Sequence, residues 1–134
     1  MRVALVDTDI LSAFLRGDPV VKEKVESYLK KFERLNISII TYYEILNGLL
    51  YKDAKKQLKA FEAFMKLNKV YPLTRRSVQI SAGIEASLRK SGKGIGHTDT
   101  LIAGIALANK MCLVTNNTRH FSRVKELEVI NWLK

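Results

Sequence analysis

The side chains of this sequence that are best suited to chemistry are acidic, and each lies beside an apolar stretch. In residues 3–11, VALVDTDIL, a short apolar run leads directly into Asp7 and Asp9. Glu44 follows a second apolar run, and Asp99 comes just before a third. Ionised carboxylates that are brought close together raise one another's pKa unless a cation lies between them. The spacing therefore indicates a site for a hard divalent cation, if the fold gathers these acids at one edge.

The candidate ligands of such a cation all carry oxygen. Thr115, Asn116 and Asn117 follow the apolar run MCLV and would add hydroxyl and amide oxygens to the same edge. Oxygen ligands without thiolates or paired histidines favour Mg²⁺ or Mn²⁺ over Zn²⁺. One or two such ions can orient a phosphodiester, activate water and stabilise the leaving oxygen. These residues therefore predict phosphodiester hydrolysis.

Each acid also has a structural explanation that competes with a functional one. A charge at the end of a buried strand is costly without a partner, so Asp7 has the strongest case for a functional role. Asp9 can cap the short helix that follows it, and Asp99 is favourable at the positive N-terminal end of a helix. Glu44 on a helix surface would ordinarily be solvated. The case for a site depends on the acids occurring together.

Strand and helix patterns alternate along the chain and would position these acids. Strands are expected at residues 2–6, 36–41, 69–74, 111–116 and 127–132, the third at a sheet edge because it contains Pro72. Helices are expected at residues 9–16, 19–33, 42–51, 53–68, 75–90, 98–109 and 119–125. The alternation predicts a mostly parallel sheet with helices on both faces, a three-layer α/β/α sandwich. The functional crevice of such a sheet lies beyond the carboxyl ends of its strands, which is where the acids fall.

Length and composition limit the class of protein. A chain of 134 residues with 47% hydrophobic and 27% charged residues predicts one globular domain over residues 1–134. The lone cysteine, Cys112, cannot form an internal disulfide, which favours a cytoplasmic location. The longest uncharged apolar run, residues 100–108, is far shorter than the roughly 20 residues of a membrane-spanning helix. We therefore expect no transmembrane segment.

The formal net charge of +10 favours a polyanionic or acidic partner. Basic residues are concentrated in residues 52–76, beginning with Lys52, Lys55, Lys56 and Lys59. These lysines would contact RNA phosphates without regard to base sequence, and such contacts weaken as salt rises. A solvated, lysine-rich helix face explains any one of them equally well.

Three segments together resemble a known family. VDTDILSAFL, ISIITYYEILNGL and GIGHTDTLIAGIALANKMCLVTNNTRHFSRVKELEVINW are similar to PIN-domain ribonucleases of the VapC toxin type, over essentially the whole chain. The resemblance implies a metal-dependent endoribonuclease with a sheet of order 3-2-1-4-5, usually a homodimer, that a cognate VapB-type antitoxin holds inactive. It suggests tRNA as a target class. Carried onto this sequence, it assigns the metal-binding catalytic acids, Asp7, Glu44 and Asp99, and their polar support, Thr115 and Asn117.

The sequence departs from the family pattern after the fourth strand. Many PIN domains have a fourth acid where this chain has Asn116 and Asn117, and some toxin relatives have an acid in place of His120. Asp9 and Asn116 remain further candidates for support. The departure leaves open whether one ion or two are bound.

Two other function classes remain as alternatives. VDTDIL also resembles the first motif of haloacid-dehalogenase-type phosphatases, in which the first aspartate attacks phosphorus and the second is a general acid. That motif continues with Gly-Thr, whereas Ile10 and Leu11 follow Asp9 here, and a late acidic pair is missing. The second alternative is a PIN fold that binds RNA or a protein partner without cutting. Cleavage of RNA chains would distinguish a nuclease from both.

Overall fold

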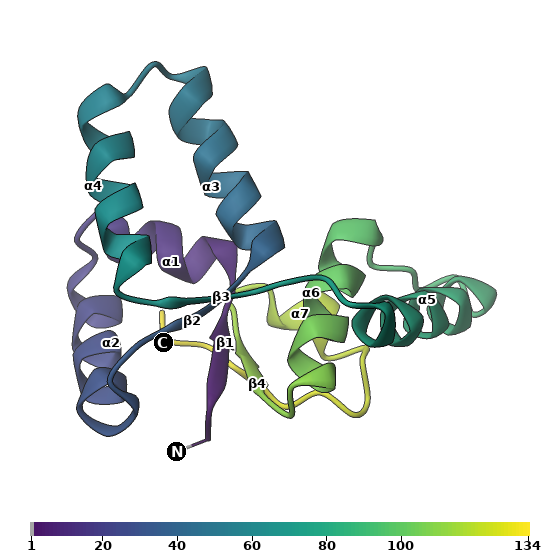
Figure 1. Cartoon of the computed structure of the whole chain (residues 1–134). Coiled ribbons are helices and arrows are strands. Elements are labelled where there is room, and N and C mark those ends of the chain that lie inside the picture. Colours follow the sequence, from purple (N-terminus) through teal and green to yellow (C-terminus); the bar gives the residue numbers. More distant parts are fainter. Residues whose placement is uncertain (1) are drawn as a thin grey trace.

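A computed structural model describes residues 2–134 and contains a five-stranded sheet of order β3-β2-β1-β4-β5 (Figure 1). The strands are β1 (Ala4–Val6), β2 (Asn36–Ser38), β3 (Lys69–Tyr71), β4 (Cys112–Val114) and β5 (Val129–Ile130). Neighbouring strands pair in parallel throughout, and the order is the one that the family resemblance implies. β3 lies at an edge of the sheet, as Pro72 directly after it predicts.

Helices cover both faces of the sheet, which gives the three layers expected from the alternating pattern. They are α1 (Thr8–Leu15), α2 (Pro19–Phe32), α3 (Ile39–Tyr51), α4 (Lys55–Lys66), α5 (Arg75–Lys90), α6 (His97–Ala108) and α7 (Thr118–Phe121). In Figure 1, α1 and α2 lie on one side of the sheet and α5, α6 and α7 on the other. No helix within residues 2–134 combines the length and apolar character needed to cross a lipid bilayer.

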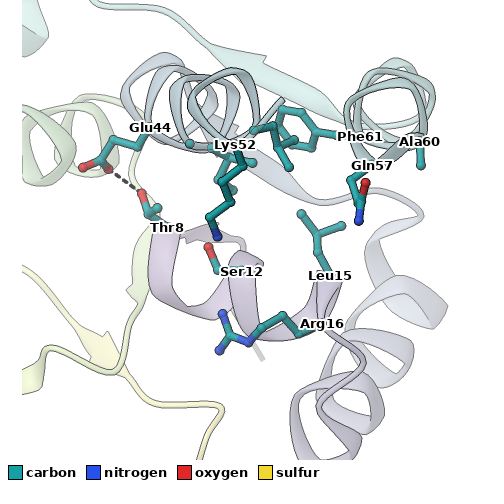
Figure 2. A pocket seen from close by; sticks show the side chains of 12 residues that line it. Thr8, Ser12, Leu15, Arg16, Glu44, Lys52, Gln57, Ala60 and Phe61 are labelled. Atoms are coloured by element: carbon teal, nitrogen blue, oxygen red, sulfur yellow. Dashed lines mark hydrogen bonds between the residues drawn. The ribbon is translucent and has the colours of Figure 1, made fainter. Parts of the chain in front are cut away.

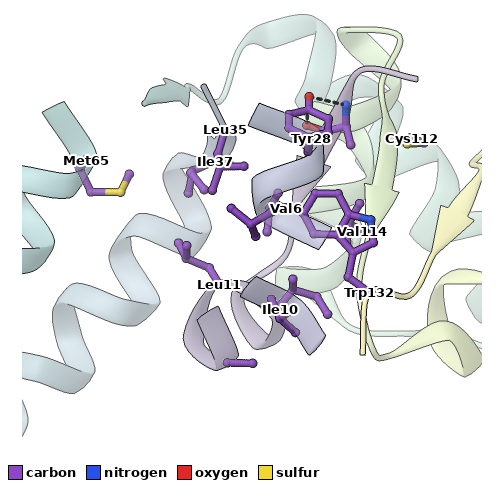
Figure 3. Close-up of a cluster of buried hydrophobic side chains, with 14 of the residues drawn as sticks. Val6, Ile10, Leu11, Tyr28, Leu35, Ile37, Met65, Cys112, Val114 and Trp132 are labelled. Atoms are coloured by element: carbon purple, nitrogen blue, oxygen red, sulfur yellow. Dashed lines mark hydrogen bonds between the residues drawn. The ribbon is translucent and has the colours of Figure 1, made fainter. Parts of the chain in front are cut away.

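The central strand β1 buries side chains on both faces, as parallel strands covered by helices do. Val6 joins a hydrophobic cluster that includes Leu11 of α1 and Tyr28 of α2 (Figure 3). Leu5 belongs to a second cluster, together with Ile105 of α6. Because successive side chains of a strand point to opposite faces, β1 is held by two cores at once. The residue that follows β1 is therefore fixed firmly in position.

The second strand is shorter than residues 36–41, the range that the sequence predicts. β2 ends at Ser38 and α3 begins at Ile39. The Ser38 side-chain oxygen accepts a hydrogen bond from the Thr41 backbone N–H at 3.0 Å, an N-cap that starts the helix. This cap outweighs the strand preference of the two isoleucines that follow it. As a result Glu44 lies in the second turn of α3, close to the end of β2.

Helices α3 and α4 form a hairpin that projects from the sheet (Figure 1). Tyr42 of α3 stacks on Phe61 of α4, with ring centroids 5.7 Å apart. Phe14 of α1 packs against Phe64 of α4, also at 5.7 Å. The hairpin is therefore anchored on α1, the helix that starts at the carboxyl end of the central strand.

Helices α5 and α6 approach closely at Gly104. A Cβ atom on Gly104 would lie 1.9 Å from the Ser81 Oγ and 2.4 Å from the Ser77 carbonyl oxygen of α5. The Ser81 hydroxyl already donates to that carbonyl at 2.9 Å. This close packing fixes α6 on α5, and α6 carries Asp99 in its first turn.

We expect Gly104→Ala to lower the free energy of unfolding by about 2 kcal/mol, because the two helices must move apart to admit the methyl group. Gly83→Ala on α5 is the matched control, since an added Cβ there has no heavy atom within 4 Å. The free energy of unfolding of the control should rise by up to about 1 kcal/mol, because alanine has a higher helix propensity than glycine. Urea denaturation followed by circular dichroism measures both. Unchanged stability of Gly104→Ala would contradict the close approach.

Candidate active site

Asp7 and Thr115 lie side by side at the carboxyl end of the sheet. β1 and β4 pair with Val6 opposite Val114, so the residues that follow these strands are neighbours. The Thr115 hydroxyl donates to Asp7 Oδ2 at 2.7 Å, and the Asp7 backbone N–H donates to the Val114 carbonyl at 2.9 Å. Asp7 is 6% exposed and Thr115 is fully buried. The strand register thus brings together two residues that are far apart in sequence.

Asp9 does not cap the first helix, so that expectation is wrong. α1 begins at Thr8, and Asp7 is its N-cap, accepting the Thr8 backbone N–H at 2.8 Å. Asp9 lies in the first turn and accepts backbone N–H groups from Ile10 at 2.7 Å and from Asn116 at 3.0 Å. Its carboxylate therefore ties α1 to the loop after β4, on the same edge as Asp7.

Glu44 reaches this edge through a threonine. The Thr8 hydroxyl donates to Glu44 Oε1 at 2.6 Å, and the Thr8 and Thr41 hydroxyl oxygens lie 2.9 Å apart. The Glu44 side chain is otherwise exposed to solvent. Because Thr8 directly follows Asp7, this hydrogen bond holds α3 against the start of α1.

Asp99 faces the loop after β4 from the first turn of α6, the position that the sequence predicts. The Asn117 side-chain amide donates to Asp99 Oδ2 at 3.4 Å, and His120 Nδ1 lies 3.2 Å from the same oxygen. The Asn117 backbone N–H donates to the Thr115 hydroxyl oxygen at 3.0 Å. A chain of hydrogen bonds therefore runs from Asp99 through Asn117 and Thr115 to Asp7.

The other residues that the sequence singles out do not place their side chains on the carboxylates. Asn116 offers only its backbone N–H to Asp9, because its exposed side chain accepts a hydrogen bond from Asn131 at 3.0 Å. Lys52 is the C-cap of α3 and is exposed. The remaining lysines occupy exposed positions on α4: Lys55, Lys56 and Lys59.

Sequence reasoning missed Glu85, a buried acid of α5. Its carboxylate accepts the backbone N–H of Ile95 at 3.3 Å and that of Gly96 at 3.0 Å. Gly96 has φ +100 and is the N-cap residue of α6, so Glu85 holds the turn from which Asp99 is presented. A signal was available, because the buried positions of α5 are Ser77, Ser81 and Glu85, a polar row at helical spacing.

Burial and like charge both oppose ionisation of Asp7. Burial is the largest cause and the charge of Asp9 the next, and with a smaller contribution from Asp99 they raise the pKa of Asp7 to about 7. The hydrogen bonds from Thr115 and Thr8 offset only part of this rise. Burial also raises the pKa of Asp9. No lysine or arginine within residues 2–134 forms an ion pair with either aspartate.

The acids line one edge without forming a closed set of ligands. Across residues 2–134, no three histidine, cysteine, aspartate or glutamate side chains lie close enough together to hold a metal ion. Glu44 is bonded to Thr8 and Asp99 to Asn117, which keeps each acid with its own neighbour. The donors nonetheless suit a hydrated Mg²⁺ or Mn²⁺, which keeps several waters beside one or two carboxylates. Asp7 is buried and has no cationic partner in the described part of the chain, so it is the carboxylate that such an ion would stabilise most.

A cavity of about 380 Å³ opens between α1 and the α3–α4 hairpin (Figure 2). Thr8 and Glu44 are part of its lining, so the cavity is continuous with the edge that carries the acids. Much of the remaining wall is apolar and includes Phe61. Arg16 and Lys52 add two cationic groups. Arg16 is a second residue that sequence reasoning did not single out.

The raised pKa of Asp7 predicts a pH-dependent stability for the metal-free protein. The pKa is about 7 in the folded chain against an ordinary value of 3.8. The Asp7 carboxyl therefore loses its proton at a lower pH in the unfolded chain than in the folded one. As a result, the free energy of unfolding falls as pH rises from about 4 to about 7. Asp7→Asn removes this loss, which is on the order of 4 kcal/mol at most.

Urea denaturation in EDTA at pH 4.5 and pH 8 measures this difference. We expect the stability of Asp7→Asn relative to wild type to be greater at the higher pH, because only there is the buried carboxylate of the wild type ionised. An advantage of equal size at both pH values would contradict the electrostatic account.

Comparison with known proteins places this geometry in a family. Residues 4–127 match the model of the PIN domain. Ribonuclease VapC1 of Haemophilus influenzae strain R2866 is 29% identical over 136 residues, which cover 98% of this chain and 99% of the relative. The tRNA(fMet)-specific endonuclease VapC of Shigella flexneri is 29% identical over 117 residues, which cover 84% of this chain and 89% of the relative.

Solved structures agree with the family match. DNA-bound VapBC from Salmonella typhimurium has a chain that superposes with a TM-score of 0.88 at 26% identity, covering 98% of this chain and 99% of that one. VapBC-1 from nontypeable Haemophilus influenzae gives a TM-score of 0.85 at 27% identity, with 98% of each chain covered. Because the PIN domain model matches residues 4–127, which are most of the chain, this chain belongs to the PIN domain family.

Proposed function

We propose that this protein is a divalent-metal-dependent endoribonuclease that hydrolyses RNA phosphodiester bonds, and that it is the toxin of a VapBC-type toxin–antitoxin pair. The observation that carries the proposal is the buried, uncompensated carboxylate of Asp7 at the edge where Glu44 and Asp99 also lie. The relatives named as ribonuclease VapC1 and tRNA(fMet)-specific endonuclease VapC support the reaction class and make tRNA a candidate substrate.

In this proposal Asp7, Glu44 and Asp99 hold one or two Mg²⁺ or Mn²⁺ ions. When bound, such an ion supplies a Lewis acid that orients the phosphodiester and activates water for attack on phosphorus. The chain's own polar groups keep the acids oriented: Thr115 holds Asp7, and Thr8 holds Glu44. Because Glu44 is exposed, its carboxylate can turn from Thr8 toward a cation at little cost.

The basic surface supplies RNA affinity in this proposal. Lys52, Lys55, Lys56 and Lys59 extend from the end of α3 along α4, and all four are exposed. Contacts of this kind recognise the phosphate backbone and are sequence-independent. The choice of RNA must come from other features of the surface.

We also propose two protein partners, a VapB-type antitoxin and a second copy of this chain. Similarity to chains of VapBC complexes supports the antitoxin. Leu50 and Tyr51 at the end of α3 are 55% and 90% exposed, whereas Leu46 and Leu49 are half-buried against the core. The exposed pair is therefore better suited to contact a partner than the half-buried pair.

Incubation of the purified protein with total RNA tests the reaction. We expect fragments in the presence of Mg²⁺ or Mn²⁺, none with EDTA, and at least a hundredfold slower cleavage by Asp7→Asn, which keeps the shape of the side chain but removes its charge. Release of phosphate from small esters with intact RNA would instead indicate a phosphatase. Cleavage that survives both EDTA and Asp7→Asn would overturn the metal-dependent mechanism.

Titration calorimetry with Mn²⁺ tests the ligand set apart from activity. We expect Asp99→Asn to bind Mn²⁺ at least tenfold more weakly than wild type, because one anionic ligand is lost. Asp53→Asn, an exposed acid at the turn after α3, is the matched control and should bind as the wild type does. Equal heats for Asp99→Asn and wild type would remove Asp99 from the site, and RNA binding without any Mn²⁺ binding would favour a non-cleaving module.

A further inference from the structure

Two of the helices that line the cavity beside Glu44 each contribute a row of side chains to it. Thr8, Ser12 and Arg16 follow one another at intervals of four along α1. On α3 the row is the equally spaced set Glu44, Gly48 and Lys52. Residues four apart lie on the same face of a helix, so each row runs along the cavity.

Both rows begin at the edge of the sheet that carries the acids, and both end with a cation. At one end the Thr8 hydroxyl is bonded to Glu44, and eight residues further along the helices are Arg16 and Lys52. Eight residues of helix correspond to about 12 Å. A chain bound at the acid edge and continuing along the cavity would therefore meet two positive charges.

Among the residues that the structure describes, the two cations lack an anionic partner. Within residues 2–134 neither Arg16 nor Lys52 forms an ion pair. In Figure 2 the Lys52 amine and the Arg16 guanidinium lie near the Ser12 hydroxyl, which is a further hydrogen-bond donor. Guanidinium, amine and hydroxyl groups together are donors that suit a phosphate.

Part of the cavity wall is apolar and has room for a ring. Leu49 and Phe61 contribute to it, and Gly48 leaves open space, since an added Cβ there has no heavy atom within 4 Å. The volume of about 380 Å³ is within the range of sites that bind small organic groups. Single-stranded RNA offers the complementary ligand, with apolar base faces and an anionic backbone.

We propose that this cavity is a nucleotide subsite, in which a base close to the scissile phosphate lies against the apolar part of the wall and a neighbouring phosphate is held by Arg16 and Lys52. The inference rests on the proposed ribonuclease function and adds to it a site that selects the substrate. Two observations favour RNA over a protein segment as the occupant. Within residues 2–134 the cations form no ion pair, and the cavity begins at the carboxylates where the RNA backbone would be cut.

Filling the cavity tests the base-binding part. Gly48→Leu places a side chain in the open space and raises helix propensity, so it should fold. Gly83→Leu on α5 is the matched control, because its added Cβ also meets no heavy atom within 4 Å. Both are made in the Asp7→Asn background, which leaves RNA uncut. The probes are a fluorescent RNA decamer of randomised sequence and a decamer of abasic spacers with the same number of phosphates.

We expect the Asp7→Asn parent and the Gly83→Leu control to prefer the RNA decamer to the abasic decamer by about tenfold, measured by fluorescence polarisation. Gly48→Leu should lose this preference while keeping the affinity for the abasic decamer. Equal affinity of the parent for both decamers would overturn the proposal. An unchanged preference of Gly48→Leu for the RNA decamer would also overturn it, and would favour a protein segment as the occupant of the cavity.

Salt dependence tests the phosphate-binding part. Arg16→Gln and Lys52→Gln should each reduce the slope of log affinity against log salt by about 0.7, the value for one phosphate contact on a single strand. Gly48→Leu should leave the slope unchanged. Unaltered slopes in both glutamine variants would overturn the assignment of these cations. Since none of these measurements involves cleavage, failure of the nuclease assay with a positive result here would reject the reaction but not the subsite.

Discussion

The carboxylate of Asp7 is removed from water at the carboxyl end of the central strand, and the groups around it replace that water only in part. Hydrogen bonds from Thr115 and Thr8 favour the ionised form, but burial and the charge of Asp9 oppose it more strongly. The position cannot relax toward solvent, because β1 is packed between two hydrophobic clusters. The two cores thus maintain an electrostatic imbalance that a bound cation would remove, as expected where function competes with stability.

Threonine hydroxyls donate hydrogen bonds to two of the acids without neutralising them. Thr115 bonds Asp7, and Thr8 bonds Glu44. A lysine or arginine in either place would form an ion pair and satisfy the carboxylate permanently. Neutral donors orient the acids and leave their charge available for a cation. This distinction explains how the edge can be well ordered and yet contain no closed group of ligands in the part of the chain that the structure describes.

Helix α1 connects the carboxylates to the surface that would hold RNA. Its N-cap residue is Asp7 and its C-cap residue is Arg16, so one short helix connects the edge that carries the acids to the cationic end of the cavity. Helix α3 does the same between Glu44 and Lys52. The hairpin of α3 and α4 is anchored on α1 by aromatic packing, which keeps the two rows of side chains in the lining of the same cavity.

The sequence by itself determined the order and type of the elements and the edge of the sheet where the acids lie, because side-chain periodicity and the direction of parallel strands are local or topological properties. The strand order 3-2-1-4-5 came from the family resemblance. The tertiary structure decided where the helices begin, with Ser38 and Asp7 as caps, and it decided the bonds from Thr8 to Glu44 and from Glu85 to the turn before α6. It also brought Arg16 and Lys52 to one cavity. The two caps are local, but the bonds made by Thr8 and Glu85 join segments distant in sequence, as does the cavity that Arg16 and Lys52 share. These longer-range contacts depend on how the helices pack, which no local pattern encodes.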